Sequence, residues 1–391
     1  MNQWKYLLGL LLPLLLACSR AGEHEVLFRQ VESVVSDHPD SAMALLERIE
    51  QPEALQDAEW HWGALLWTQA KDKLFIRHTS DSLINSVVAY YDTHGDNHQK
   101  ALAYYYKGRV NSDLGQLREA TTAYLTASGY AKETSDVNLN YGILSQIGTL
   151  YAHKNMTNEA LDVYKQALVV ARQAGDSTKI AFSYAYLGRI YGEKNEWDKA
   201  DSCYQYSIQI SRSIHNYRTL RLGMQELSAV YTEQGRLDEA LFLAKQLKDF
   251  ENMNGLPPNG GRLFVIGDIY RKLHQLDSAY FYLSQAMGSG NIYTRRSAYG
   301  ALSDLFREKN RHEEAGHFDQ LYHAVSDSIE AMGTHSDIRH IKDQFGWEER
   351  EAFRFKIHLA GSVIGLVLIV IILFMSRRYL KERKGREAEQ E

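Results

Sequence analysis

Two stretches that lie forty residues apart decide the fold: IGTLYAHKNMTNEALDVYKQA at residues 147–167 and LGRIYGEKNEWDKADSCYQYS at residues 187–207. Both place a glycine, an aromatic residue, a turn residue, an alanine and a second aromatic residue at the same offsets. A fixed period of this size is typical of solenoids, in which each structural unit stacks on its neighbours. The repeat therefore predicts a stack of helical hairpins.

The same order continues through six units between residues 101 and 323. Each unit has a small residue within its first helix: Gly108, Gly148, Gly188, Ser228, Gly267 and Ser303. Seven positions later comes a turn residue: Gly115, Asn155, Asn195, Gly235, His274 and Asn310. Glycine adopts positive φ without penalty, and asparagine and histidine adopt it more readily than most residues, so this column predicts the end of the first helix.

Alanine and aromatic columns predict how the two helices of a hairpin pack. Twelve positions after the small residue every unit has alanine: Ala120, Ala160, Ala200, Ala240, Ala279 and Ala315. So small a side chain lets the second helix approach the first closely. Three positions after the small residue comes a mostly aromatic column, which we expect to fill the gap that the small residue leaves: Asn111, Tyr151, Tyr191, Tyr231, Tyr270 and Phe306. On the second helix Tyr124, Tyr164 and Tyr204 are expected to pack onward, where later units have Ala244, Leu283 and Asp319.

This order of small and aromatic residues resembles the tetratricopeptide repeat (TPR), a helical hairpin that stacks into a right-handed superhelix. The resemblance implies an all-α fold. The period is near 40 and not 34, and the proline that often closes a unit is missing, which we interpret as longer helices. Residues 24–96 have helical periodicity without the full signature, so they are predicted to be degenerate hairpins that cap the stack.

The N-terminal segment predicts export. Residues 1–17 combine Lys5 with a short apolar run, which is typical of a signal peptide and too short to cross a bilayer. The sequence Leu15-Leu16-Ala17-Cys18 resembles the lipobox of bacterial lipoproteins, and the resemblance implies that Cys18 becomes the lipidated N-terminus. An ordinary signal peptide or an uncleaved anchor are the alternatives.

The C-terminal segment predicts a membrane anchor. Residues 357–375 carry only one ionisable group, His358, and are long enough for a transmembrane helix. The basic tail at residues 376–391 indicates that the C-terminus is cytoplasmic. We therefore expect a protein of the bacterial inner membrane, with its repeats in the periplasm.

A juxtamembrane helix is expected at residues 324–356. Five apolar residues have heptad spacing there, and they would allow a homodimer through a short coiled coil: Ile338, Ile341, Phe345, Ala352 and Phe355.

Composition and motifs argue against several function classes. A net charge of −5 gives no basic field for nucleic acid. Cys18 and Cys203 are the only two cysteines, and Cys203 has no partner pattern for catalysis. HEEAGH at residues 312–317 suggests zinc, but its histidines are five apart and point about 140° away from each other on a helix. We therefore predict no catalytic residue, no metal, no cofactor and no enzymatic activity.

The predicted binding surface is the concave groove formed by the first helices. Aromatic and arginine side chains in such a groove suit an extended peptide or a partner helix. By register the groove residues are Tyr105, Arg109, Arg189, Gln225, Phe264, Asp268, Arg271 and Lys272. An ordinary solvated surface is the alternative interpretation of these side chains.

The organisation of the chain resembles periplasmic TPR sensors in which a membrane helix joins the repeats to a cytoplasmic output domain. Only sixteen residues follow Met375, so this chain is expected to lack that domain. Two hypotheses follow. The chain is a membrane-anchored scaffold that binds an unknown protein or peptide, or it is a sensory or signalling subunit that relays a periplasmic state to a separate output protein.

Overall fold

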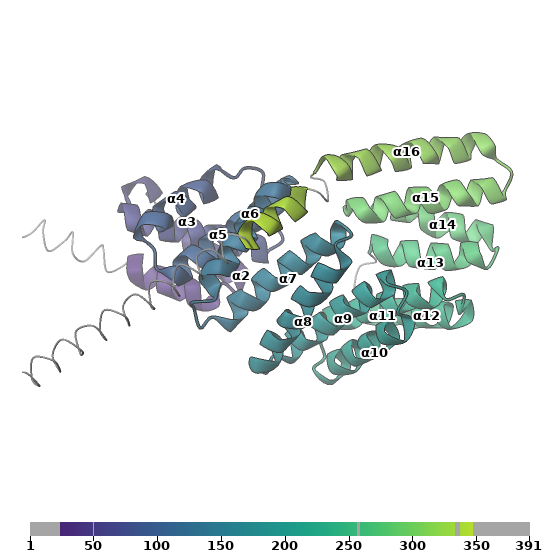
Figure 1. Cartoon of the computed structure of the whole chain (residues 1–391), viewed down its shortest axis with the longest axis horizontal. Helices are drawn as coiled ribbons and strands as arrows, with labels where there is room; N and C mark the ends of the chain where they lie inside the picture. The colour runs from purple at the N-terminus through teal and green to yellow at the C-terminus, as the bar shows by residue number, and fades with distance from the viewer. Residues whose placement is uncertain (1–23, 50, 256–258, 333–336, 347–391) are drawn as a thin grey trace, which may run out of the picture. The chain divides into compact units, whose positions relative to one another are not determined.

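The computed structural model describes residues 24–49, 51–255, 259–332 and 337–346, and Figure 1 shows helix after helix along them. The described residues form α-helices and one short 3-10 turn, and they contain no strand. They divide into one unit that ends at Ile338 and a second that begins at Arg339 and is helical as far as residue 346.

The first unit opens with helices that carry the predicted cap. A helix over residues 24–34 is followed by α2 (Pro39–Leu46), a 3-10 turn (Pro52–Ala54), α3 (Asp57–Lys73) and α4 (Ser82–His94). Phe28 and Val31 form a small core with Leu46 and Leu66, so α2 and α3 are joined by apolar packing.

Six hairpins follow. Their first helices are α5 (Asn97–Leu114), α7 (Val137–His153), α9 (Ser177–Glu193), α11 (Tyr217–Glu233), α13 (Gly260–Lys272) and α15 (Ile292–Glu308). Their second helices are α6 (Leu117–Ala131), α8 (Thr157–Gln173), α10 (Trp197–Ser213), α12 (Leu237–Met253), α14 (Leu276–Ala286) and α16 (His312–Ala331). Extensive contacts join helices that are adjacent or next but one in the chain, as expected for a solenoid.

Local sequence explains where the first helices begin and end. Each begins after an aspartate or asparagine whose side chain accepts a hydrogen bond from the N–H three residues on: Asp96, Asp136, Asp176, Asn216, Asn259 and Asn291. Each is followed by a residue at positive φ: Gly115 (78°), Asn155 (55°), Asn195 (57°), Gly235 (73°), His274 (56°) and Asn310 (56°). The predicted turn column is therefore confirmed in all six units.

The alanine column is confirmed as the site of close approach. All six alanines are at most 3 % exposed. They belong to the second helices, so their small side chains let each second helix lie close to its neighbours.

One packing prediction is wrong. The gap beside the small residue is filled from the second helix, by the tyrosine that lies sixteen positions on. A Cβ atom added to Gly108 would lie 2.4 Å from Cε1 of Tyr124, and one added to Gly148 would lie 2.5 Å from Cε1 of Tyr164. The aromatic residue three positions on belongs to the same helix as the small residue, so it lies beside the gap and not opposite it.

Several predictions fall outside the described residues: the signal peptide at 1–17, the lipidation of Cys18, the membrane helix at 357–375 and the tail at 376–391. No helix in the described part of the chain is both long and apolar enough to span a bilayer. The coiled-coil prediction needs a correction at Ile338. This side chain is 0 % exposed and packs in the core formed by α5 to α9 of its own chain, so it is not available for a dimer.

Candidate functional site

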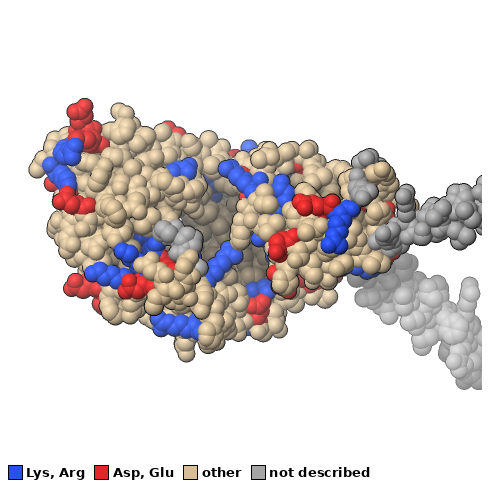
Figure 2. Space-filling view, turned by 180° about the vertical axis from the view of Figure 1, so that it is seen from behind, with Lys and Arg blue, Asp and Glu red and all other residues tan. Residues whose placement is uncertain are grey.

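The first helices of the hairpins share one face, here called the inner face. It consists of residues three before, one after and five after the small residue, which lie on one side of a helix because they are four apart. On α7 this face ends at His153, whose ring meets the ring of Tyr293 on α15 with centroids 4.4 Å apart. The end of the inner face on α7 thus contacts the start of α15 in the last unit. Figure 2 shows a hollow in the surface with Lys and Arg side chains at its edge.

Arg109 joins the cap helix α3 to the first helices α5 and α7. Its Nε donates to Oδ1 of Asp72 on α3 at 2.7 Å, and its Nη1 donates to Oε1 of Gln146 on α7 at 3.2 Å. Both partners are 37 residues away, one in each direction. The predicted groove cation is therefore already paired within the stack.

Arg189 makes the equivalent contact two units later. Its Nη2 donates to Oε1 of Glu226 on α11 at 2.8 Å, and its Nε donates to Oε2 at 3.3 Å. The nearby carboxylate of Glu226 raises the pKa of Arg189. The Arg189 side chain is 33 % exposed, so this guanidinium keeps contact with solvent.

Asp268, Arg271 and Lys272 are brought together in one network. Arg271 bridges Oδ1 of Asp268 at 2.9 Å and Oε1 of Glu308 at 2.8 Å. Lys272 Nζ lies 2.9 Å from Oε1 of Glu233. Charged side chains of α11, α13 and α15 thus form a ladder between units.

The remaining predicted residues serve mainly in packing. Tyr105 meets Tyr106 edge to face with ring centroids 5.0 Å apart, and burial raises its pKa to about 12. Phe264 packs beside the apolar cores of the later units. A Cβ atom on Gly261 would lie 2.9 Å from Nε2 of Gln225, so this amide lies close to α13.

The sequence interpretation missed two groups of the inner face, His153 and Glu193. Burial, followed by the charges of Arg189 and Lys154, lowers the pKa of His153 to about 4, so the imidazole is neutral at neutral pH. Burial raises the pKa of Glu193. Both residues nevertheless keep exposed surface. Each lies four residues after the position that Arg109 and Arg189 occupy in their units. Residues four apart share one face of a helix, so this spacing could have predicted them.

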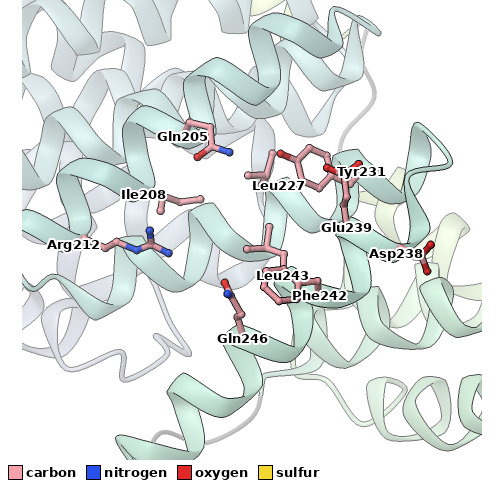
Figure 3. A pocket seen from close by; sticks show the side chains of 10 residues that line it. All are labelled: Gln205, Ile208, Arg212, Leu227, Tyr231, Asp238, Glu239, Phe242, Leu243 and Gln246. Carbon is pink, nitrogen blue, oxygen red and sulfur yellow. The ribbon is translucent and has the colours of Figure 1, made fainter.

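A second concavity lies on the other side of the hairpins, between α10 and α12. Figure 3 shows its lining: Ile208 and Leu227 contribute apolar surface, and Arg212 and Glu239 lie apart on α10 and α12. Its volume is about 340 Å³, and Phe242 beside it is 64 % exposed. None of the predicted groove residues lines this pocket.

Cys203 and the two histidines of the HEEAGH segment are the groups that the sequence analysis weighed for chemistry. Burial raises the pKa of Cys203 to about 11, which keeps it a thiol at neutral pH, and no acid or base is the cause of that shift. No group of three histidine, cysteine, aspartate or glutamate side chains in the described ranges is placed to hold a metal ion. His312 and His317 therefore remain two separate side chains of α16.

Comparisons with known proteins agree with this architecture. The family profile described as the MalT-like TPR region matches residues 91–257. A search of curated protein sequences found no match. Among solved structures, a Rap protein complexed with Competence and Sporulation Factor superposes with a TM-score of 0.59 at 13 % identity, covering 80 % of this chain and 100 % of that one. NprR in complex with its cognate peptide NprX gives 0.59 at 13 % identity, covering 83 % and 99 %.

The apo form of RapI gives a TM-score of 0.58 at 12 % identity, covering 79 % of this chain and 98 % of that one. At such identities these likenesses concern the fold. Together with the profile match over residues 91–257 and the six-unit signature, they show that the repeat region has the tetratricopeptide-repeat fold.

Proposed function

We propose that this protein is a non-catalytic scaffold that binds an extended segment of a partner protein in the hollow lined by the inner face. The observation that carries the proposal is that the exposed Glu193 carboxylate lacks a binding partner among the described residues. Its side chain is exposed on the inner face and makes no ion pair or hydrogen bond with another described residue. The neighbouring Arg189 is held by Glu226, and the neutral ring of His153 offers no charge in its place. A donor from a partner would satisfy this carboxylate.

The spacing of the inner face favours an extended partner segment. Packed helices lie about 8–10 Å apart, and the inner-face groups come from successive first helices. A compact small molecule would reach one or two of them, whereas a peptide in extended form would reach several. The fold shared with NprR, which was solved with its cognate peptide, and with a Rap protein solved with Competence and Sporulation Factor, supports a peptide or protein ligand.

The location we propose is the inner membrane, with the repeats in the periplasm. The support is the apolar run before Cys18, the apolar residues 357–375 and the basic residues that follow. Protease added to spheroplasts should digest the repeats, and a Cys18→Ser variant should lose labelling by a fatty-acid analogue. Protected repeats with a cleaved tail would contradict this topology.

A signalling subunit is the second candidate. It is favoured by the contact of Lys154, in the turn between α7 and α8, with the end of α16, because α16 leads toward the predicted membrane helix. Deletion of residues 376–391 separates the candidates, since a scaffold keeps its phenotype without the tail and a relay loses it.

Partner capture by the full-length protein tests the scaffold. An Arg189→Gln/Glu226→Gln double variant removes the ion pair without leaving an unpaired charge, and it changes the surface that faces the hollow. We expect it to reduce partner capture on the order of tenfold, as loss of about 1.4 kcal/mol of binding would. Lys165→Glu, on the exposed side of α8, should leave capture unchanged. Equal capture by both variants would contradict the proposal.

A further inference from the structure

The end of α16 contacts the turns of the first two repeat units. The ammonium of Lys154, between α7 and α8, donates to the carbonyl oxygen of Ile329 at 3.3 Å. The N–H of Leu117, the first residue of α6, lies 3.3 Å from the carbonyl oxygen of Met332 and 3.1 Å from that of Gly115. These contacts join segments that are 175 and 215 residues apart. A solenoid held by neighbouring units alone does not need them.

The chemistry of helix ends explains why these contacts form. The last carbonyl groups of an α-helix and the first N–H groups of another have no partner within their own helix. At the end of α16 the carbonyls of Ile329 and Met332 find donors in Lys154 and in the first N–H of α6. The positive charge of Lys154 also interacts favourably with the partial negative charge at the C-terminus of α16. Lys154 is 6 % exposed, and Glu330 and Asp337 are the carboxylates that act on its charge.

An apolar contact completes the junction. Ile338 is 0 % exposed and packs in the core of α5 to α9, and Met332 packs against the same core. Nη1 of Arg118 lies 3.8 Å from Oδ1 of Asp337. Residues before and after the end of α16 thus contact the helices of the first repeat units.

The geometry points to a latch: the end of α16 docks on the α5–α6 and α7–α8 turns, closes the repeat stack on itself and sets the width of the hollow. His153, next to Lys154, contacts Tyr293 of α15, so this end of α7 and the turn after it contact both helices of the last unit. Release of the latch separates the first two units from the last and frees the segment that continues toward the C-terminus. Use of the latch by a bound partner rests on the proposed function, but the closure itself does not.

Hydrogen–deuterium exchange of the full-length protein in detergent tests the latch without a partner. In Ile338→Asp a charge enters the apolar core, and in Lys154→Met the helix-end donor is lost while the aliphatic side chain remains. We expect both variants to speed exchange of the Leu117 amide about tenfold or more, whereas amides of α11 and α12 keep their protection. Ile338→Leu should restore the slow exchange. Ala324→Asp, on the exposed side of α16, is the control and should behave like the parent protein.

Two outcomes would overturn the inference. One is unchanged exchange at Leu117 in both Ile338→Asp and Lys154→Met. The other is loss of protection in α11 and α12 together with Leu117 in the Lys154→Met protein, since that pattern would mean that the junction is part of one cooperative core. Failure of partner capture, with a working latch, would instead count against the proposed function alone.

Discussion

The first three units and the last three pair their helices with different side chains. In units one to three a glycine faces a tyrosine: Gly108 with Tyr124, Gly148 with Tyr164, and Gly188 with Tyr204. In the later units the pairs are Ser228 with Ala244, Gly267 with Leu283, and Ser303 with Asp319. The two positions of a pair vary together, because a larger residue on one helix is matched by a smaller or hydrogen-bonding residue on the other. Complementary volume across the interface, and not one residue type at one position, thus specifies the hairpin.

The largest loss of stability is expected when the tyrosine of a glycine–tyrosine pair is truncated. Tyr164 is 2 % exposed, and its hydroxyl lies 3.1 Å from Oγ1 of Thr149. Tyr164→Ala should lower the free energy of unfolding by about 3–5 kcal/mol, as for other large aromatic truncations. Ala244→Gly in unit four should cost only about 1 kcal/mol. Urea unfolding, monitored by hydrogen exchange in each unit, would measure the free energy of unfolding of the two variants. Equal losses in the two variants would contradict the comparison.

A methyl group on the facing glycine should cost less. Gly148→Ala places Cβ 2.5 Å from the Tyr164 ring, so we expect a loss of about 1–3 kcal/mol in the free energy of unfolding. Gly316→Ala is the control, because a Cβ there has no neighbour within 4 Å, and it should stabilise α16 by up to about 1 kcal/mol.

The serine–alanine pair of unit four can also be introduced at the equivalent positions of unit two. Gly148→Ser combined with Tyr164→Ala should be more stable than Tyr164→Ala alone, because the serine fills part of the gap. A double variant that melts below the single one would show that the pairs do not compensate each other.

The serine hydrogen bond of the later units should be worth less than a packed ring. Oγ of Ser228 donates to the carbonyl oxygen of Ala240 at 2.8 Å in a buried position. Ser228→Ala should cost about 0.5–1.5 kcal/mol in the thermal unfolding of unit four. Ser328→Ala, on the exposed side of α16, should change stability by less than about 0.5 kcal/mol.

Two histidines should give small pH effects of opposite sign. The pKa of His153 is about 4 in the folded chain, below its ordinary value of 6.5. As the pH falls from 6.5 to 4, the unfolded chain therefore binds a proton that the folded chain does not, and the free energy of unfolding decreases. The hydrogen bond to Asp136 raises the pKa of His98, so its contribution is present at low pH and is lost as pH rises. Thermal unfolding is measured between pH 4 and 8. As the pH falls, the unfolding temperature of His153→Gln should decrease less than that of the parent protein, and that of His98→Gln should decrease more. Parallel curves for the two variants would be inconsistent with this assignment.

Local rules account for what the sequence predicted well. The turns at Asn155 and Asn195 follow from the residue type at one position, and the structure has both at positive φ. The alanine column needed only the repeat period, because a small residue at every unit marks close approach.

The missed features depend on contacts over longer distances. Arg189 finds Glu226 37 residues away, and neither side chain carries a local signal for the other. Ile338 was assigned to a coiled coil from its heptad spacing, but the core of α5 to α9 provided a nearer apolar surface. Sequence periodicity predicts which face of a helix is apolar, and it does not predict which surface that face will meet.

Site-specific photo-crosslinking tests the central claim most directly, that the hollow holds a partner segment. A photoreactive amino acid at Glu193 would lie exposed on the inner face, and the same amino acid at Lys165 would lie exposed on α8. Mass spectrometry of the full-length protein crosslinked in native membranes would identify the attached peptide. The account predicts one defined partner segment at Glu193 and none at Lys165. Crosslinks at Lys165 alone, or the same scattered products at both positions, would contradict it.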